Sequence, residues 1–311
     1  MSLKPLLFSI IIPTYNRPQQ LTHCLTALAE QDFSTQRFEV IIVNDGGDSL
    51  EDVVESFKGR LAIALIYQQN TGPAQARNQG ATLAKGDFLA FTDDDCCPSA
   101  DWLSQLAKQC QATPEVLIGG QTLNSLPQNF CSTASQLTVE LAYQYFNPSP
   151  HEARFFASNN MVFPRQHFLK LGGFHAEFRT SEDREICDRW LLSGRTMIYV
   201  SAVKIHHTHR LSLSDFWQQH LGYGRGAYCY HTIRSKRGSP PFRPDFSFHR
   251  RLFTYPFQQF AAPKAVAISG LMCLAQLASL VGYFLEKNRS SQTLDRLYKE
   301  LVPLTSMLGH S

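Results

Sequence analysis

The chain has 311 residues, of which 43% are apolar and 18% are charged, and its formal net charge is +3 at pH 7. That composition supplies a substantial hydrophobic core, so it excludes a disordered chain and a collagen-like or repetitive polymer. The charge is too small to favour nucleic acid as a partner, and a mean hydropathy of −0.21 excludes a polytopic membrane protein.

The cysteines and the first residues indicate the compartment. Eight cysteines are spaced irregularly and form no Cys-x-x-Cys pair, which is not typical of a zinc site or of a disulfide framework. We therefore expect reduced thiols in a cytoplasmic protein. One lysine and a short apolar run precede Pro13, and this run predicts a strand, because a secretory signal peptide needs a longer apolar core.

The first 120 residues alternate between β-branched apolar runs and segments with helical spacing. Strands are predicted at residues 6–12, 38–43, 61–67, 87–92 and 116–120, and helices from Pro18, around 50–57, at 73–84 and from Trp102. Apolar strands that alternate with helices predict an α/β protein with a doubly wound, mostly parallel sheet.

Beyond residue 120 the pattern is less regular. Helices are predicted at 136–145, 165–171, 182–192 and 213–223, and extended segments at 155–163 and 196–200. The glycine-rich residues 222–226 are similar to a phosphate loop, but they follow a helix and no strand precedes them, so they predict a flexible connection. The basic, Pro- and Gly-rich segment 234–243 predicts a loop.

Residues 265–285 form an apolar segment with Lys264 before it and Lys287 and Arg289 after it. Its length is about that of a helix that crosses a bilayer. Gln276 and many small residues oppose a spanning helix, and the alternatives are a helix packed on the globular domain or one lying in the membrane interface. We expect an association with a membrane surface, and the three placements stay open.

Polar side chains follow three of the predicted strands at the point where each strand ends. Ligands of doubly wound sheets bind at the carboxyl ends of the strands. A single polar turn after a strand is ordinary, but three that share one edge indicate a binding site. The residues concerned are Thr14, Tyr15 and Asn16, then Asn44 and Asp45, then Asp93, Asp94 and Asp95.

The three consecutive aspartates point to a cation. Adjacent carboxylates repel one another unless a positive charge lies among them, and oxygen ligands suit Mg²⁺ or Mn²⁺. In an extended chain Asp93 and Asp95 lie on the same side and form an Asp-x-Asp pair. The alternative is an N-terminal cap for the helix near Trp102, for which one aspartate would suffice.

Two further patches complete the polar edge. Asp45, followed by Gly46 and Gly47, joins a strand to a helix, and its carboxylate can accept hydrogen bonds from a base or a ribose. Arg77 lies one helical turn past Pro73, where it can meet a phosphate or hold the aspartate cluster, and the sequence leaves both interpretations open.

The order of these motifs resembles family 2 glycosyltransferases. The resemblance spans residues 6–210, roughly two-thirds of the chain. It implies a GT-A fold, a nucleotide-sugar donor and inversion at the anomeric carbon. The motifs that carry it are Phe-Ser-Ile-Ile-Ile-Pro-Thr-Tyr-Asn-Arg at 8–17, Val-Asn-Asp-Gly at 43–46, Gly-Pro-Ala-Gln-Ala-Arg-Asn at 72–78 with Gly80, Phe-Thr-Asp-Asp-Asp at 91–95, Gly-Gly-Phe at 172–174 and Ser-Glu-Asp at 181–183.

The resemblance also implies roles for single residues. Asp183 would be the general base that takes the proton of the acceptor hydroxyl. Asp95, with Asp93, would hold Mn²⁺ or Mg²⁺, and His206 would complete the metal site. Asp45 would contact the base, which is most simply uracil. The donor as a whole would contact Pro13, Thr14, Tyr15, Asn16, Arg17, Asp45, Arg77, Asp93 and Asp94.

Several of these roles have structural alternatives. The segment that begins at Ser181 also reads as an exposed helix start whose acidic residues favour the helix dipole. The histidines around His206 also read as solvated loop residues. Asn159 and Asn160 would lie near a sugar, or would form a buried pair of satisfied amides.

The resemblance implies one domain at residues 1–240, followed by a helical C-terminal extension at 241–311. Within that domain, 1–120 would bind the nucleotide and 121–240 the acceptor, which would be a glycan, a lipid or another hydroxyl compound. A sugar-phosphate nucleotidyltransferase is disfavoured, because no glycine-rich loop follows the first strand. A catalytically silent protein that binds nucleotide sugars, or a membrane scaffold, stays open as the alternative.

Overall fold

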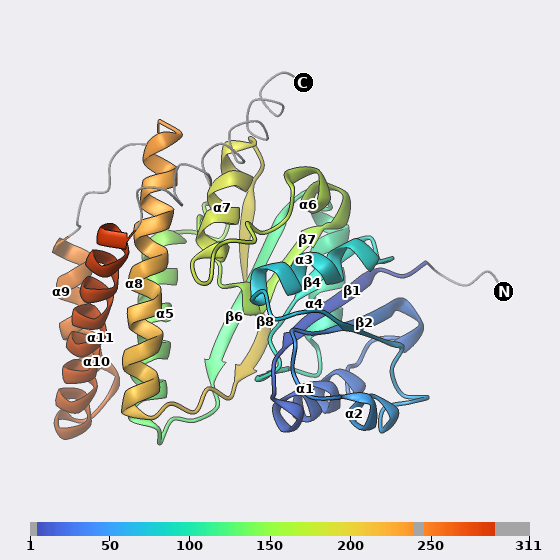
Figure 1. Cartoon of the computed structure of the whole chain (residues 1–311), viewed down its shortest axis with the longest axis horizontal. Helices are drawn as coiled ribbons and strands as arrows, with labels where there is room; N and C mark the ends of the chain where they lie inside the picture. The colour runs from blue at the N-terminus through green and yellow to red at the C-terminus, as the bar shows by residue number, and fades with distance from the viewer. Residues whose placement is uncertain (1–4, 239–245, 290–311) are drawn as a thin grey trace. The chain divides into compact units, whose positions relative to one another are not determined.

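The computed structural model describes residues 5–238 and 246–289, which divide into two compact units (Figure 1). The first unit comprises residues 5–123, Ser149–Glu177 and Ile186–Thr208. The second comprises Asn124–Pro148, Phe178–Glu185 and the described residues from His209 onward. The boundary expected after residue 240 lies outside the described residues, as does the part of the expected extension beyond residue 289.

The first unit is built on a mixed eight-stranded sheet in the order β3-β2-β1-β4-β7-β6-β8-β5. Neighbours within β3-β2-β1-β4 pair in parallel, whereas the β4–β7, β7–β6 and β5–β8 pairs are antiparallel. The α/β class is confirmed, although the parallel part is smaller than expected. The strands are β1 (Phe8–Thr14), β2 (Phe38–Asn44), β3 (Ile63–Tyr67), β4 (Phe88–Phe91), β5 (Cys96–Pro98), β6 (Leu117–Asn124), β7 (Met161–Pro164) and β8 (Met197–His207).

Helices cover both faces of the parallel strands. Ile10 and Ile12 of β1 belong to the same core as Leu21 and Leu25 of α1, whereas Ile11 lies on the other face under α3. Burial on both faces explains why β1 is mostly apolar rather than alternating. The helices of this unit are α1 (Pro18–Ala29), α2 (Glu51–Glu55), α3 (Pro73–Leu83), α4 (Trp102–Ala112), α6 (Arg165–Leu171) and the part of α7 (Glu182–Leu192) from Ile186 onward, with short 3₁₀ turns η1 (Thr35–Arg37) and η2 (Ser158–Asn160).

An aromatic cluster fixes the centre of the sheet, where the parallel strands give way to antiparallel ones. Phe91 ends β4, and its ring lies 5.9 Å from Phe163 of β7 and 5.1 Å from both Phe168 and Phe174. Trp190 meets Phe163 edge-on at 5.3 Å. Edge-to-face contacts of this kind are directional, so the cluster holds the end of β4, from which the three aspartates continue, in a rigid position.

The second unit consists of helices. These are α5 (Phe130–Phe146), α8 (Leu213–Lys236), α9 (Phe246–Thr254), α10 (Pro256–Gln259) and α11 (Ala262–Arg289). Ser212 and Asp215 form a capping box at the start of α8. The expected flexible connection at residues 222–226 is wrong, because these glycines lie inside α8. Residues 234–236 of the expected basic loop also belong to α8, and residues 239–243 lie outside the described residues.

Among the described residues, one helix, α11, is long and apolar enough to cross a bilayer, with a hydropathy of 1.9 over its most apolar window. A third of that window is buried inside the protein, through small and aliphatic residues that include Ala265, Ala275 and Ala278. Its opposite side exposes apolar side chains, among them Val266, Leu277, Leu280, Phe284 and Leu285. In Figure 1, α11 runs alongside α8.

Candidate active site

A cavity of about 290 Å³ opens at the carboxyl ends of β1, β2 and β4. It gathers, from stretches far apart in the sequence, most of the side chains that the strand-end argument selected. Asn16 does not line the cavity, and instead accepts a hydrogen bond from the backbone N–H of Asp48. The lining residues are Pro13, Thr14, Tyr15, Arg17, Asp45, Pro73, Arg77, Asp93, Asp94 and Asp95.

The end of β1 is tied to the aspartates. Thr14 donates a hydrogen bond from Oγ1 to Oδ2 of Asp94 over 2.7 Å, and both side chains are buried. The guanidinium of Arg17 lies 3.2 Å from a carboxylate oxygen of Asp94 and 3.2 Å from one of Asp95. One half-exposed cation therefore faces two of the three carboxylates.

The aspartates do not lie on an extended strand. Asp94 and Asp95 form a turn in which the backbone N–H of Cys96 donates to the carbonyl of Asp93. We expected the side-chain alternation of an extended strand to place Asp93 and Asp95 on one side, and this is wrong because the chain turns here. Both residues nevertheless line the cavity. The alternative of a helix cap is also wrong, because β5 intervenes and Asp101 precedes α4.

Asp45 anchors the loop that leads into α3. Its Oδ1 accepts from Gln68 Nε2 at 2.7 Å and from the Thr71 N–H at 2.9 Å, and its Oδ2 accepts from the Gly72 N–H at 2.8 Å. The side chain is buried but lines the cavity. Each carboxylate oxygen has two lone pairs, so Oδ2 keeps acceptor capacity beyond the loop that it holds.

Arg77 contacts the aspartate cluster. This buried guanidinium donates from Nη2 to Oδ1 of Asp93 at 2.6 Å and lies over the Phe174 ring. Of the two interpretations that the sequence left open, the contact with the cluster is therefore present. The next residue, Asn78, exchanges hydrogen bonds with the backbone N–H and carbonyl of Phe174, which fixes α3 against the chain after Gly173.

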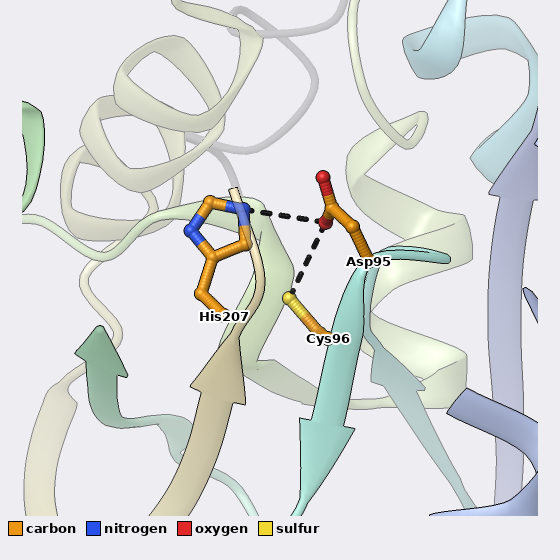
Figure 2. Close-up of side chains that lie close together, drawn as sticks. All are labelled: Asp95, Cys96 and His207. Atoms are coloured by element: carbon orange, nitrogen blue, oxygen red, sulfur yellow. Dashed lines mark hydrogen bonds and ion pairs between the residues drawn. The ribbon is translucent and has the colours of Figure 1, made fainter. Parts of the chain in front are cut away.

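Asp95, Cys96 and His207 form a compact group (Figure 2), in which the ligand atoms all lie within 4.8 Å of one another. His207 Nε2 lies 3.2 Å from Asp95 Oδ1, and the thiol of Cys96 donates to the same oxygen at 3.7 Å. The β5–β8 register, which pairs Cys96 with His207, produces this contact. His206, the expected metal ligand, pairs with Cys97 and is exposed, and it does not belong to this group.

Burial and like charges shift the titration of these groups. Burial, together with the neighbouring carboxylates, raises the pKa of Asp94 to about 6, against the opposing effect of Arg17 and Thr14. Burial alone would lower the pKa of His207, but the hydrogen bond and charge of Asp95 outweigh it, so that pKa is raised. Burial raises the pKa of the Cys96 thiol well above its ordinary value.

The chemistry of these side chains fits a divalent cation held by Asp95 and His207. A carboxylate oxygen and an imidazole nitrogen converge there, beside an acidic cavity. The thiol of Cys96 donates a hydrogen bond to Oδ1 of Asp95 in this arrangement. That Asp93 also binds the metal stays a prediction.

The paired asparagines have different environments. Asn160 is completely buried, accepts from Trp102 Nε1, and donates to the carbonyls of Gln121 and Val203. It is therefore a satisfied core amide that ties three parts of the first unit together. Asn159 accepts from Thr122 Oγ1 at 3.3 Å.

Asp183 belongs to the second unit, in the first turn of α7. Its Oδ1 accepts from the backbone N–H of Arg184. The turn is not the exposed helix start that was the alternative, because Glu182 and Glu185 are buried and Glu185 forms a 2.6 Å ion pair with Arg237. Three carboxyl groups in one largely buried turn exceed what a helix dipole requires.

The comparisons with known proteins agree with the fold. The family model described as Glycosyl transferase family 2 matches residues 9–172, more than half of the chain. The protein therefore belongs to glycosyl transferase family 2, which confirms the family expected from the sequence.

Curated relatives include transferases from several organisms. Over 127 residues the chain is 37% identical to validoxylamine A glucosyltransferase of Streptomyces hygroscopicus subsp. jinggangensis. The matched segment covers 40% of this chain and 30% of the relative. Over 235 residues it is 28% identical to hyaluronan synthase of Pasteurella multocida, covering 64% of this chain and 24% of the relative. The chain thus spans 30% or less of the length of these relatives.

Two solved structures share the fold. A mannosyltransferase from Pyrobaculum calidifontis in complex with GDP-Man and Mn²⁺ has a TM-score of 0.61 at 19% identity, and the match covers 99% of this chain and 87% of that one. Residues 1–349 of TarS from S. aureus, in complex with UDP-GlcNAc, have a TM-score of 0.55 at 19% identity, with 91% of each chain covered.

Sequence reasoning missed His207, Cys96 and Gln68. A signal for His207 was present, because the apolar Val203 and Ile205 are buried and the polar Lys204 lies between them and is exposed. Extending that alternation by one step directs residue 207 inward and residue 206 outward. Gln68 follows β3 as Asp45 follows β2, so the strand-end argument applied to a third strand would have found it.

Proposed function

We propose that this protein is a metal-dependent, inverting glycosyltransferase that moves a sugar from a nucleotide diphosphate, most simply a UDP-sugar, to a hydroxyl acceptor. The observation that carries the proposal is the cavity at the strand ends, where Asp45 and the three aspartates meet Arg17 and Arg77. Family membership supports it, and the relatives named glucosyltransferase and the neighbours bound to UDP-GlcNAc and GDP-Man agree with it.

In this proposal the nucleotide binds along Pro13–Arg17 and beside Asp45, with its diphosphate near Arg77 and the aspartates. Asp95 and His207 hold Mn²⁺ or Mg²⁺. The cation would offset the negative charge that develops on the diphosphate as it leaves. Arg77 keeps Asp93 in place through its 2.6 Å ion pair.

The reaction would be a single displacement at the anomeric carbon. The carboxylate of Asp183 takes the proton of the acceptor hydroxyl while that oxygen forms a bond to the sugar carbon. The bond from this carbon to the diphosphate oxygen breaks, and its electron pair leaves with the nucleoside diphosphate. Attack opposite the leaving group inverts the configuration. The acceptor would be a glycan, a lipid or another hydroxyl compound.

We also propose a cytoplasmic protein attached to a membrane surface through α11. All eight cysteines are free thiols, as a reducing compartment requires. The exposed side of α11 is apolar, and Lys264, Lys287 and Arg289 lie at its ends, where they can meet anionic lipid headgroups. The buried side of α11 packs on α8 and α5, which favours a helix that lies along the surface.

A screen of nucleotide sugars and nucleoside diphosphates by thermal shift, with and without Mn²⁺, tests the function. A ligand that binds only the folded state raises the melting temperature, and the stabilisation grows with the logarithm of the ratio of ligand concentration to dissociation constant. We expect one nucleotide series to stabilise the protein and its sugar donor to be turned over. Stabilisation without turnover on any acceptor or on water would favour the alternative, a silent nucleotide-sugar-binding protein.

A further inference from the structure

The backbone immediately before the acidic turn of α7 is strained. Ser181 has a φ of +69°, in the left-handed region that side chains other than glycine rarely adopt. Such a conformation persists only where the surroundings hold it in place. Ser181 is followed directly by Glu182 and Asp183, so whatever holds this residue also sets the direction in which α7 begins.

Helix α8 supplies that support through its glycines. Thr180 donates a hydrogen bond from Oγ1 to the carbonyl of Gly222 over 2.8 Å. One helical turn further along α8, Gly226 faces Thr180 and Ser181, and it carries no side chain. A Cβ at Gly226 would lie 2.3 Å from Thr180 Oγ1, 2.5 Å from the Thr180 carbonyl oxygen and 2.7 Å from Ser181 Oγ. The turn therefore rests directly on the backbone of α8.

The opposite face of the same helix segment is equally close to α11. A Cβ at Gly224 would lie 1.9 Å from the carbonyl oxygen of Ser279, and one at Gly282 would lie 2.0 Å from that of Leu221. Glycine inside a helix lowers helix stability, and at Gly224 and Gly226 the close contacts explain why glycine is present despite that cost. The α8 backbone is confined between the turn on one side and α11 on the other, so it cannot retreat from an added side chain.

A second contact joins α7 to α8. Glu185 is completely buried, and its carboxylate forms a 2.6 Å ion pair with Arg237, which follows the last turn of α8. In the sequence Asp183 lies between Thr180 and Glu185, each of which contacts α8 or the residue that follows it. Both ends of the acidic turn are thus fixed to the same helix, which leaves little freedom for the carboxylate between them.

We propose that Gly226 is a positioning residue for Asp183: by carrying no side chain it lets the Thr180–Ser181 turn seat on α8 and so sets where the Asp183 carboxylate meets the acceptor. This inference rests on the proposed function, in which Asp183 accepts the proton. It also assigns a role to the Gly-Tyr-Gly-Arg-Gly motif of residues 222–226, which neither nucleotide binding nor metal binding uses.

Gly226→Ala tests the proposal. The added methyl group must displace the Thr180 backbone by several tenths of an ångström, and displacements of this kind lower turnover far more than binding. We expect kcat to fall about 10- to 100-fold, while KM for the donor and the dissociation constant for UDP stay within about twofold. UDP binding reports that the first unit is folded, and the far-ultraviolet circular dichroism spectrum reports on the helices of the second unit, in which Gly226 lies.

Two matched variants control for the change from glycine to alanine. In Gly222→Ala the new methyl group meets only Thr180 Cγ2, at an ordinary 3.6 Å, and the carbonyl that accepts from Thr180 is retained. We expect a much smaller loss of kcat than in Gly226→Ala. In Gly270→Ala of α11 the methyl group meets no atom within 4 Å, and we expect wild-type kinetics.

Thr180 gives a second measurement if Gly226→Ala does not fold. Thr180→Val keeps the shape and removes the hydrogen bond to Gly222, so kcat should fall while UDP affinity is kept. Thr180→Ser keeps the hydroxyl and should restore kcat. Equal kinetics of Thr180→Val and Thr180→Ser would overturn the proposal, as would equal kinetics of Gly226→Ala and Gly222→Ala.

A double-mutant cycle separates this inference from the proposed function. If Gly226 acts through Asp183, Gly226→Ala should add almost nothing to the loss caused by Asp183→Asn. If Asp183→Asn leaves turnover intact, the proposed base is wrong, whatever Gly226→Ala does. If Asp183→Asn lowers turnover as expected and the effect of Gly226→Ala is fully additive, the base stands and the positioning role fails.

Discussion

The Nε2 atom of His207 lies 3.2 Å from Oδ1 of Asp95, across the β5–β8 pair, whereas His206 points away from it and is exposed. If these two side chains hold the metal, His207→Ala should weaken Mn²⁺ binding at least about tenfold, the loss typical of a disturbed metal site. Titration of Mn²⁺ by electron paramagnetic resonance in the presence of UDP measures this directly. His206→Ala is the matched control, and the opposite ranking of the two variants would make His206 the ligand.

Asp45 holds the loop before α3 and also lines the cavity, so a single substitution should affect both stability and nucleotide binding. Asp45→Ala leaves Gln68 and the backbone N–H groups of Thr71 and Gly72 without their acceptor. We expect the free energy of unfolding to fall by about 2–3 kcal/mol, because hydrogen bonds to a charged group are lost. UDP affinity should fall as well. Gln68→Ala removes only one donor and should cost less, so calorimetric UDP titration and urea unfolding of both variants check the ranking.

Asp183→Asn keeps the size of the side chain and removes its basicity. We expect transfer to fall by about 10²- to 10⁴-fold, the range typical of general-base catalysis, with UDP affinity unchanged. Glu177→Gln, at an exposed carboxylate earlier in the chain, is the control and should behave as wild type. Retained transfer in Asp183→Asn would remove this residue from the proposed mechanism.

His220 should make the stability of the second unit depend on pH. It is buried against Phe216 and Tyr223, and burial, with a smaller effect of His209, lowers its pKa to about 4. Because the unfolded state protonates first, stability is complete above pH 6.5 and is lost as pH falls toward 4. The loss is on the order of 3 kcal/mol.

Urea unfolding between pH 7 and pH 4 measures this loss. In His220→Leu the contribution of this residue should disappear, and the curve of stability against pH should flatten in that window. His151→Gln changes an exposed histidine and should leave the curve unaltered. A curve that keeps its full slope in His220→Leu would assign the pH dependence to other groups.

The exposed side of α11 should bind anionic membranes. Replacing Leu277 and Leu280 by serine removes apolar surface that lies in solvent, so folding should be little affected. Binding to vesicles of phosphatidylcholine and phosphatidylglycerol should weaken roughly tenfold or more. Cosedimentation measures it, with Leu192→Ser as the control at an exposed leucine of α7. Equal sedimentation of wild type and the double variant would exclude this surface as the membrane contact.

Strand positions were predictable because burial on both faces leaves an unmistakable local pattern. The runs that form β1, β2 and β4 are mostly apolar, and most of the polar residues selected at their ends line the cavity. The later strands were harder. β5 has three residues, and β8 extends to His207 through a segment whose outward residues are polar, so neither has the composition of a buried strand.

The amino-acid sequence by itself determined the α/β class, the edge at which the site lies and most of the residues of the cavity, because each follows from short-range pattern and from the common direction of parallel strands. Only the tertiary structure decided that His207 rather than His206 meets Asp95, since a shift of one residue along a strand reverses the side to which a side chain points. It also decided that residues 222–226 continue a helix, because the atoms that require glycine at Gly224 and Gly226 come from Ser279 and Thr180, distant in sequence.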